Sequence, residues 1–186
     1  MVTWIVLAVA AAIIVVGIVL YNRLVRSQQM ANEGWSGIDV QLKRRADLIP
    51  NLVDTVKGYA SHERTLFDEV ARLRTEAARI REDDVAARGA AESRLSASVG
   101  KLIALAEAYP DLKASENFGK LQAELSTVED EIQMARRYYN GAVRNLNIMI
   151  ESFPSNFVAQ LFGFRLRDYF EIADGERAVP QVAFRG

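Results

Sequence analysis

The 186-residue sequence contains no cysteine and only one histidine. The lack of cysteine excludes a disulfide framework, thiolate zinc sites and cysteine nucleophiles. The single histidine, His62, has no second histidine with which to form a metalloprotease motif, and we interpret it as a surface or capping residue near a turn. A glycine-rich phosphate loop, a Ser-His-Asp set and an RNA-binding motif are also missing. These absences argue against an enzyme, a bound cofactor or metal, and nucleic acid as a partner.

Charge is absent from residues 2–20, and the first charged side chain is Arg23. As a helix, this apolar run spans roughly 28 Å, close to the ~30 Å hydrocarbon core of a bilayer. No basic residue precedes the run and no small-residue cleavage site follows it, so we expect a retained anchor over residues 1–21 rather than a cleaved signal peptide. The anchor residues expected in contact with lipid or its interface are Trp4, Leu7, Ile14, Leu20 and Tyr21.

Basic residues follow the apolar run but do not precede it. The positive-inside rule therefore places the N-terminus outside and the rest of the chain in the cytoplasm, as a single-pass protein of the cytoplasmic membrane. The formal net charge of the whole chain is only −1, which gives no overall attraction to nucleic acid or to anionic lipid.

Apolar residues recur at alternating steps of three and four over residues 22–153, which is the pattern of a helical bundle. Residues 118–153 show the pattern most clearly and keep its register without a slip. The breaks that divide the pattern into four helices lie at Gly58 and Ser61, at Asp83 or Asp84, and at Pro110. The predicted fold is all-α: a single N-terminal transmembrane helix followed by a long antiparallel four-helix bundle.

The predicted helix lengths indicate how much of the two long helices the two short helices can cover. The first and fourth helices, expected at residues 22–60 and 115–153, would each reach about 58 Å. The two helices between them are shorter and cover only part of that length. We therefore expect the long helices to leave apolar surface that a further partner must bury.

Pro50 lies inside the first helical pattern, where it removes one backbone hydrogen bond and crowds the preceding turn. Either the helix kinks at Pro50 or two helices meet there. The apolar period continues in phase from Leu42 to Ile49, which favours a single kinked helix.

The fourth helix must return toward the bilayer, because the first helix leaves it and neighbouring helices are antiparallel. We expect residues 154–172 to form a short amphipathic element at the membrane surface and residues 173–186 to form an extended or mobile tail. The expected membrane-proximal interface comprises Arg23, Arg26, Phe157, Phe162, Phe164, Arg165 and Arg167.

Arg45 occupies a core position of the first helical pattern. It either belongs to a solvated charged face, or it pairs inside the bundle with an acid from residues 129–131 of the fourth helix and so sets the register. Several asparagines, among them Asn140 and Asn147, lie near the bundle seam, and we interpret them as structural rather than as a ligand pocket. The residues predicted to fix the register are Arg45, Asp47 and Asn51.

Three strings carry a family resemblance: residues 39–60 (DVQLKRRADLIPNLVDTVKGYA), residues 135–147 (ARRYYNGAVRNLN) and residues 153–164 (FPSNFVAQLFGF). The chain resembles the LemA family of bacterial membrane proteins over about residues 21–171. The resemblance implies an N-terminal anchor and a long antiparallel bundle, usually cytoplasmic, with no catalytic residues to carry over. The chain departs from the family pattern at residues 27–29 and at Gly34, which replaces a usual alanine and should loosen the helix by about 1 kcal/mol.

Two functions are compatible with these features. The first is a self-associating helical scaffold that organises or shapes the membrane. The alternative is an adaptor that presents a helical face to a membrane enzyme, protease or signalling kinase. The expected partners are membrane lipid and further copies of the chain and, for the adaptor, another membrane protein.

Overall fold

The computed structural model describes residues 1–81 and 83–171, and these residues contain helices and connecting segments but no strand. The helices are α1 (Val2–Lys57), α2 (Arg64–Arg79), α3 (Val85–Glu107), α4 (Pro110–Lys113), α5 (Glu116–Glu151) and α6 (Ser155–Leu161). The prediction of an all-α fold is confirmed. The predicted tail, residues 173–186, lies outside the described residues.

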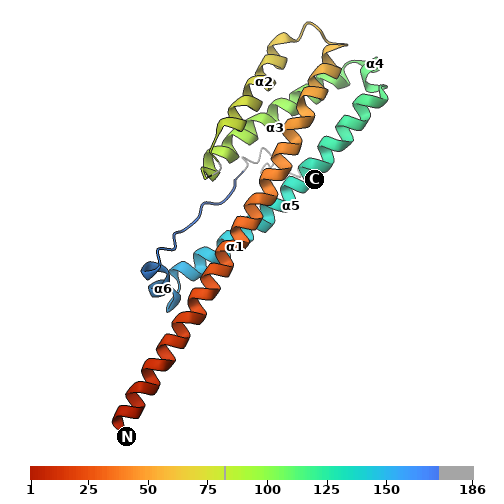
Figure 1. The fold of residues 1–186 in the computed structure, drawn as a ribbon. Coiled ribbons are helices and arrows are strands. Elements are labelled where there is room, and N and C mark those ends of the chain that lie inside the picture. Colours follow the sequence, from red (N-terminus) through yellow and green to blue (C-terminus); the bar gives the residue numbers. More distant parts are fainter. Residues whose placement is uncertain (82, 172–186) are drawn as a thin grey trace, which may run out of the picture.

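The predicted anchor and the first bundle helix are one continuous helix. α1 has 56 residues, which corresponds to about 84 Å. Pro50 lies inside it without splitting it, and the helix ends only at the cap residue Gly58. The N-terminal part of α1 extends beyond all other described elements (Figure 1). The apolar stretch of α1 is not buried within the described residues, and α1 is long and apolar enough to cross a membrane.

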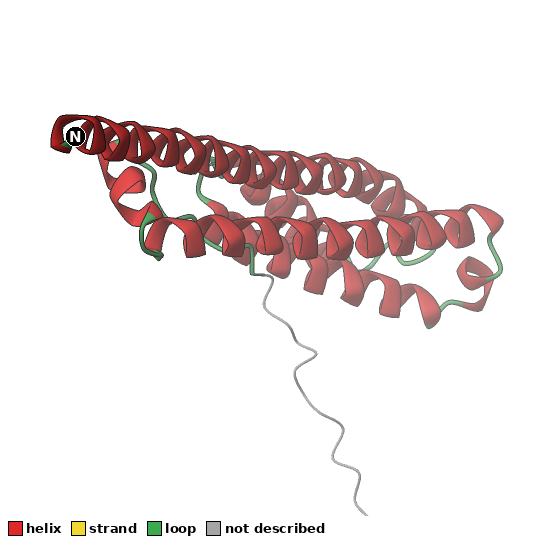
Figure 2. Ribbon diagram, turned by 90° about the horizontal axis from the view of Figure 1, so that it is seen from below, coloured by secondary structure: helices red, strands yellow, loops and turns green. Residues whose placement is uncertain are grey.

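α5 runs antiparallel to α1 and makes the most extensive contact with it of any helix pair (Figure 1). The long helices run side by side along one direction (Figure 2). The half of this pair nearer the apolar run is the proximal half. Its core residues include Leu24, Ala31, Ile38, Ile132, Tyr139, Val143 and Leu146.

Gly34 allows α1 and α5 to approach closely in the proximal half. A Cβ atom at this position would lie 2.9 Å from the Cα of Tyr139 and 3.1 Å from Cδ1 of Tyr138. Real Cβ atoms do not approach backbone this closely, so an alanine would force the helices apart. The expectation that Gly34 only loosens the helix therefore missed its packing role.

α2 and α3 pair with each other and lie along the other half of α1, which we call the distal half (Figure 1). The distal core draws side chains from α1 to α5, and examples are Leu52, Val56, Phe67, Leu95, Leu102 and Phe118. Asp84 caps α3, because its Oδ1 accepts a hydrogen bond from the Ala87 amide at 3.0 Å. The two shorter helices thus cover mainly the distal half, and the start of α3 reaches the proximal core through Val85.

After α6 the chain leaves the end of the apolar run and extends along α5 toward the beginning of α3 (Figure 1). We call residues 165–171 the strap. The membrane-surface element expected over residues 154–172 stays a prediction. Within it, hydrogen bonds from Asn140 and Asn147 hold the strap along α5. The strap and α6 cover one side of the proximal half. The two long helices therefore expose less apolar surface than the helix lengths alone predict.

Candidate functional site

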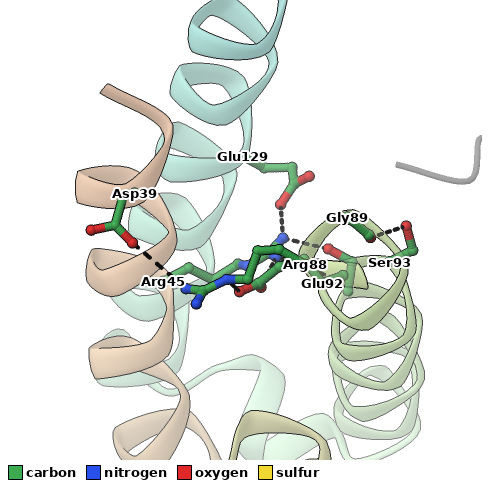
Figure 3. Close-up of polar contacts among 8 residues, drawn as sticks. Asp39, Arg45, Arg88, Gly89, Glu92, Ser93 and Glu129 are labelled. Carbon is green, nitrogen blue, oxygen red and sulfur yellow. Dashed lines mark hydrogen bonds and ion pairs between the residues drawn. The ribbon is translucent and has the colours of Figure 1, made fainter. Parts of the chain in front are cut away.

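Arg45 is the centre of a buried charge network between three helices (Figure 3). Its side chain is 2% exposed. Its Nη2 donates to Oε2 of Glu92 at 2.6 Å, and its Nη1 donates to Oε2 of Glu129 at 2.8 Å. Nη1 also donates to the hydroxyl of Ser96. One guanidinium group on α1 therefore binds both α3 and α5.

Glu92 extends this network to a second arginine. Its Oε1 accepts a hydrogen bond from Nε of Arg88 at 3.0 Å, and Nη2 of Arg88 lies 3.7 Å from Oδ1 of Asp39. Glu92 is 3% exposed, whereas Glu129 is 40% exposed and can remain hydrated. A buried charge is tolerated only when it is paired, so sliding α3 along α1 by one turn would strand Arg45 and Glu92. The network therefore favours one register of the distal half.

The structure places the three predicted register residues differently. Arg45 is buried and contacts Glu129, one of the acids of residues 129–131. Asp47 and Asn51 are exposed on α1, and among the described residues their side chains make no hydrogen bond or ion pair across the bundle. We therefore do not assign these two residues to the register. Glu92, which does contribute, was missed because its role depends on where α3 packs.

Asn140 and Asn147 on α5 bind the strap by its main chain. Oδ1 of Asn140 accepts from the Phe170 amide at 2.9 Å, and its Nδ2 donates to the Phe170 carbonyl at 3.1 Å. Asn147 makes the same pair of bonds with Arg167, at 3.0 and 2.9 Å. Each carboxamide thus offers one donor and one acceptor to a single residue, as a neighbouring β-strand does.

The spacing of the two asparagines matches the strap. Seven residues of α-helix rise about 10.5 Å, and three extended residues cover about 10 Å. Asn140 and Asn147 therefore meet Phe170 and Arg167 without bending either chain. We call this face of α5 the amide seat.

Three further contacts fix the end of the strap. The hydroxyl of Tyr139 donates to the carbonyl of Asp168 at 2.9 Å. The Phe170 side chain is fully buried, and its ring centroid lies 5.5 Å from that of Trp35. A Cβ atom on Gly89 of α3 would lie 2.3 Å from the carbonyl oxygen of Glu171, so only glycine permits this approach.

Burial raises the pKa of the Tyr139 hydroxyl above its ordinary value. The positive charge of Arg167 opposes this rise, and the negative charge of Asp168 adds to it. The neutral hydroxyl is also the form that donates to the Asp168 carbonyl. Burial and hydrogen bonding therefore favour the same protonation state.

α6 and the turn after it lie beside the end of the apolar run. The ring centroid of Tyr21 is 4.7 Å from that of Phe162 and 5.9 Å from that of Phe164. Large apolar side chains nevertheless remain exposed here: Phe153 at 80%, Phe157 at 63%, Leu161 at 78% and Phe162 at 58%. We call these four residues the aromatic base.

The other predicted membrane-proximal residues fall into two groups. Arg23, Arg26 and Arg165 are exposed. Phe164 is half-buried against the proximal core, and Arg167 is half-buried and lines a cleft beneath the strap. We therefore do not assign Arg167 to the lipid-facing surface. Among the predicted anchor residues, Trp4, Leu7, Ile14 and Tyr21 are exposed and Leu20 is half-buried.

Comparison with known proteins identifies the family. The sequence profile of the LemA family matches residues 34–184. The chain belongs to the LemA family. The matched part contains the Arg45 network and the amide seat, and it begins after the apolar run.

Three relatives of this LemA-family chain illustrate the similarity. It is 30% identical over 156 residues to Protein LemA of Metamycoplasma hominis, covering 84% of this chain and 71% of that protein. It is 26% identical over 175 residues to Magnetosome protein MamQ 2 of Paramagnetospirillum magneticum, covering 81% of this chain and 64% of that protein. It is 24% identical over 189 residues to Magnetosome protein MamQ of Magnetospirillum gryphiswaldense, covering 87% and 70%. The chain therefore spans about two thirds of the length of these relatives.

The remaining titratable groups of this LemA-family chain suggest no chemistry. Within the described residues, no three histidine, aspartate or glutamate side chains gather as they would around a metal ion. His62 is exposed in the turn between α1 and α2. The Arg81 guanidinium lowers the pKa of the Asp83 carboxyl by a hydrogen bond, and this pair lies on the surface.

Proposed function

We propose that this protein is a non-enzymatic, single-pass membrane scaffold that self-associates and so organises or shapes the membrane. The apolar part of α1 spans the cytoplasmic membrane with its N-terminus outside, and the helical rod stands in the cytoplasm. The observation that carries the proposal is the contact between Tyr21 and Phe162, because it brings the chain after α5 back to the point where the anchor leaves the bilayer.

The aromatic base suits a lipid interface. Its four side chains are exposed, Phe162 contacts Tyr21, and α6 contains no charged residue. Burial of one such side chain in lipid contributes about 1.5–3 kcal/mol, and aromatic rings favour the headgroup region. The neighbouring arginines Arg23 and Arg26 suit the anionic inner leaflet. The base would therefore occupy the inner leaflet on one side of the anchor only.

Exposed apolar side chains outside the anchor support self-association. Met134 and Tyr138 follow one another on one stripe of α5, at 54% and 46% exposure. On α1, Val40 is 59% exposed and Met30 is 38% exposed. The MamQ relatives are named as magnetosome proteins, and their names state no reaction.

Energy transfer between labelled copies in proteoliposomes tests the scaffold. The chain has no cysteine, so Gly119→Cys, at an exposed position far from the anchor, carries a donor dye in one preparation and an acceptor dye in another. We expect transfer that persists when lipid is added to dilute the protein. Transfer that falls to the value for randomly distributed monomers would overturn self-association. Replacing both Met134 and Tyr138 with serine should reduce transfer, with Asn145→Ser on the same helix as the control.

An apolar groove favours the adaptor as the second candidate. A cleft of about 470 Å³ lies between α3 and α5, with Val99, Ile103 and Leu125 in its walls. Such a groove can accept apolar side chains of another membrane protein. Crosslinking in native membranes followed by mass spectrometry separates the two functions. Links between copies support the scaffold, and links from a photoreactive residue placed at Ile103 to one dominant foreign chain support the adaptor.

A further inference from the structure

The amide seat recognises the main chain of the strap far more than its side chains. The four bonds from Asn140 and Asn147 all go to backbone atoms, and so does the bond from Tyr139. Recognition of this kind resembles the addition of a strand to a sheet, where main-chain bonds supply the affinity. The seat therefore accepts an extended segment equally well from its own chain or from another copy.

The strap is attached to the helices at few points. Between them it bridges a cleft of about 420 Å³, which Trp35, Tyr139, Leu166 and Arg167 help to line. Leu166 is 54% exposed and Tyr169 is 42% exposed. Phe170 is thus the one strap side chain that is fully buried. It belongs to the proximal core, so release of the strap exposes this ring, and binding to the same seat on another copy buries it again.

Gly163 provides a hinge between α6 and the strap. Its φ angle is +74°, a conformation that glycine adopts freely, and no atom lies within 4 Å of the position of a Cβ. Rotation there would redirect the strap while α6 stays in place. Residues 164–171 reach roughly 25 Å when extended, whereas packed helices lie only about 8–10 Å apart.

Copies of the chain that are anchored in one membrane stand at the same height above its surface. Anchors that span the same bilayer present every strap and every amide seat at equal distances above its surface. Exchange between neighbours then forms the same bonds as the closed monomer, which is the condition for low-cost domain swapping. High local concentration in the membrane favours exchange further.

We propose that the strap of one copy binds the amide seat of a neighbouring copy, so that strap exchange links the membrane-anchored rods. The proposal rests on the self-association proposed above and supplies its contact. The partner is a second copy of this chain, which donates an extended segment in the register Arg167 to Asn147 and Phe170 to Asn140.

Crosslinking between two single-cysteine variants tests the exchange. Asn147→Cys in one copy and Arg167→Cys in another place thiols on the seat and on the strap. The two proteins carry tags of different size, are reconstituted together in liposomes and are treated with a short bifunctional thiol reagent. We expect a crosslinked species of mixed composition. The double variant Asn147→Cys/Arg167→Cys confirms that the thiols are within reach, and Gly119→Cys paired with Arg167→Cys reports random collisions.

A second pair of variants keeps the proposal falsifiable if the cysteine variants fold poorly. Gly89→Ala closes the position that the Glu171 backbone occupies, whichever copy donates the strap. Gly100→Ala is the control on the same helix, because a Cβ there meets nothing within 4 Å. We expect Gly89→Ala to weaken association about tenfold, measured by energy transfer in proteoliposomes, and Gly100→Ala to leave it unchanged.

The outcomes separate this inference from the proposed scaffold. A mixed crosslink above the collision control, with loss of association in Gly89→Ala, supports strap exchange. Energy transfer that persists without a mixed crosslink overturns strap exchange and leaves the scaffold standing. Absence of energy transfer in the labelled Gly119→Cys protein that carries no other substitution overturns both.

Discussion

The distal and proximal halves of the rod are stabilised in different ways. In the distal half, side chains from several helices surround an apolar core, and Arg45 with its two glutamates locks three helices together. In the proximal half, two long helices pack closely at Gly34, and an extended strap covers one side through its backbone. The distal half depends on buried charge, whereas the proximal half depends on close backbone approach and amide hydrogen bonds.

This difference indicates that the distal half is fixed in register, whereas the strap of the proximal half can rearrange. Breaking a network of buried charges leaves unpaired charges inside, so the distal half is rigid in register. The strap bonds exchange readily with water or with the same segment of another copy, because a net hydrogen bond contributes only about 1 kcal/mol. The half that lies next to the membrane is therefore the half that can rearrange.

The largest expected effect on stability comes from removing the buried ion-pair partner of Arg45. Glu92→Leu should lower the free energy of unfolding by about 3–5 kcal/mol, because it leaves a buried guanidinium without its main partner. Arg45→Met combined with Glu92→Leu should recover most of the loss. Urea unfolding followed by circular dichroism in detergent measures both. If Glu92→Leu costs no more than an exposed substitution such as Glu124→Leu, the distal half does not depend on this pair.

Removal of the amide seat should affect the proximal half alone. Asn140→Ala combined with Asn147→Ala deletes four hydrogen bonds to the strap and should lower amide protection at Arg167 and Phe170 by about tenfold or more. Hydrogen exchange with mass spectrometry measures this, and peptides from the distal core should not change. Asn145→Ala, at an exposed position of α5, is the control. Equal protection of the strap in the double variant and the control would contradict the assigned role of the seat.

Two glycines on α1 test the close approach in the proximal half. Gly34→Ala should destabilise the protein by about 1–3 kcal/mol, because the new Cβ meets the Tyr139 backbone. Gly37→Ala, where a Cβ meets nothing within 4 Å, should stabilise the helix by up to about 1 kcal/mol. Thermal unfolding of the two variants should therefore shift in opposite directions, and a shift in the same direction would show that Gly34 is not a contact point.

The smallest expected effect is an alkaline pH dependence from Tyr139. Its pKa is raised in the folded state, so its contribution to stability is complete below the unfolded pKa of about 10 and is lost as the pH rises through the folded value. The stability difference between the unmodified protein and Tyr139→Phe should therefore shrink above about pH 10. Unfolding measured from pH 8 to pH 11 checks this, and a difference that stays constant would mean that Tyr139 titrates normally.

Helical periodicity predicted the all-α fold, the long first helix and the partial cover by α2 and α3. Each of these follows from spacing within a single helix. The core position of Arg45 left two alternatives open, a solvated charged face or an interior partner among residues 129–131, and the contact with Glu129 supports the second. Glu92 could not be predicted, because its contact with Arg45 depends on how α3 packs against α1.

The strap was missed although its signals are present in the sequence. Asn140 and Asn147 are seven residues apart, and Phe164, Arg167 and Phe170 recur every third residue. Neither spacing identifies its partner alone, because only the turn at Gly163 brings the segment back along α5. The role of Gly34 could not be predicted from the sequence either. A glycine inside a helix indicates either a less stable helix or a close contact with another helix, and only the position of Tyr139 distinguishes the two.

The depth of residue 157 in the bilayer tests most directly the claim that the rod returns to the membrane from which it starts. Phe157→Cys carries a spin label in proteoliposomes, with Ile14→Cys as the embedded reference and Gly119→Cys as the aqueous one. The account predicts that the label at residue 157 is shielded from water-soluble relaxation agents and lies at the lipid headgroups. A label as accessible to water at residue 157 as at residue 119, while residue 14 stays embedded, would contradict it.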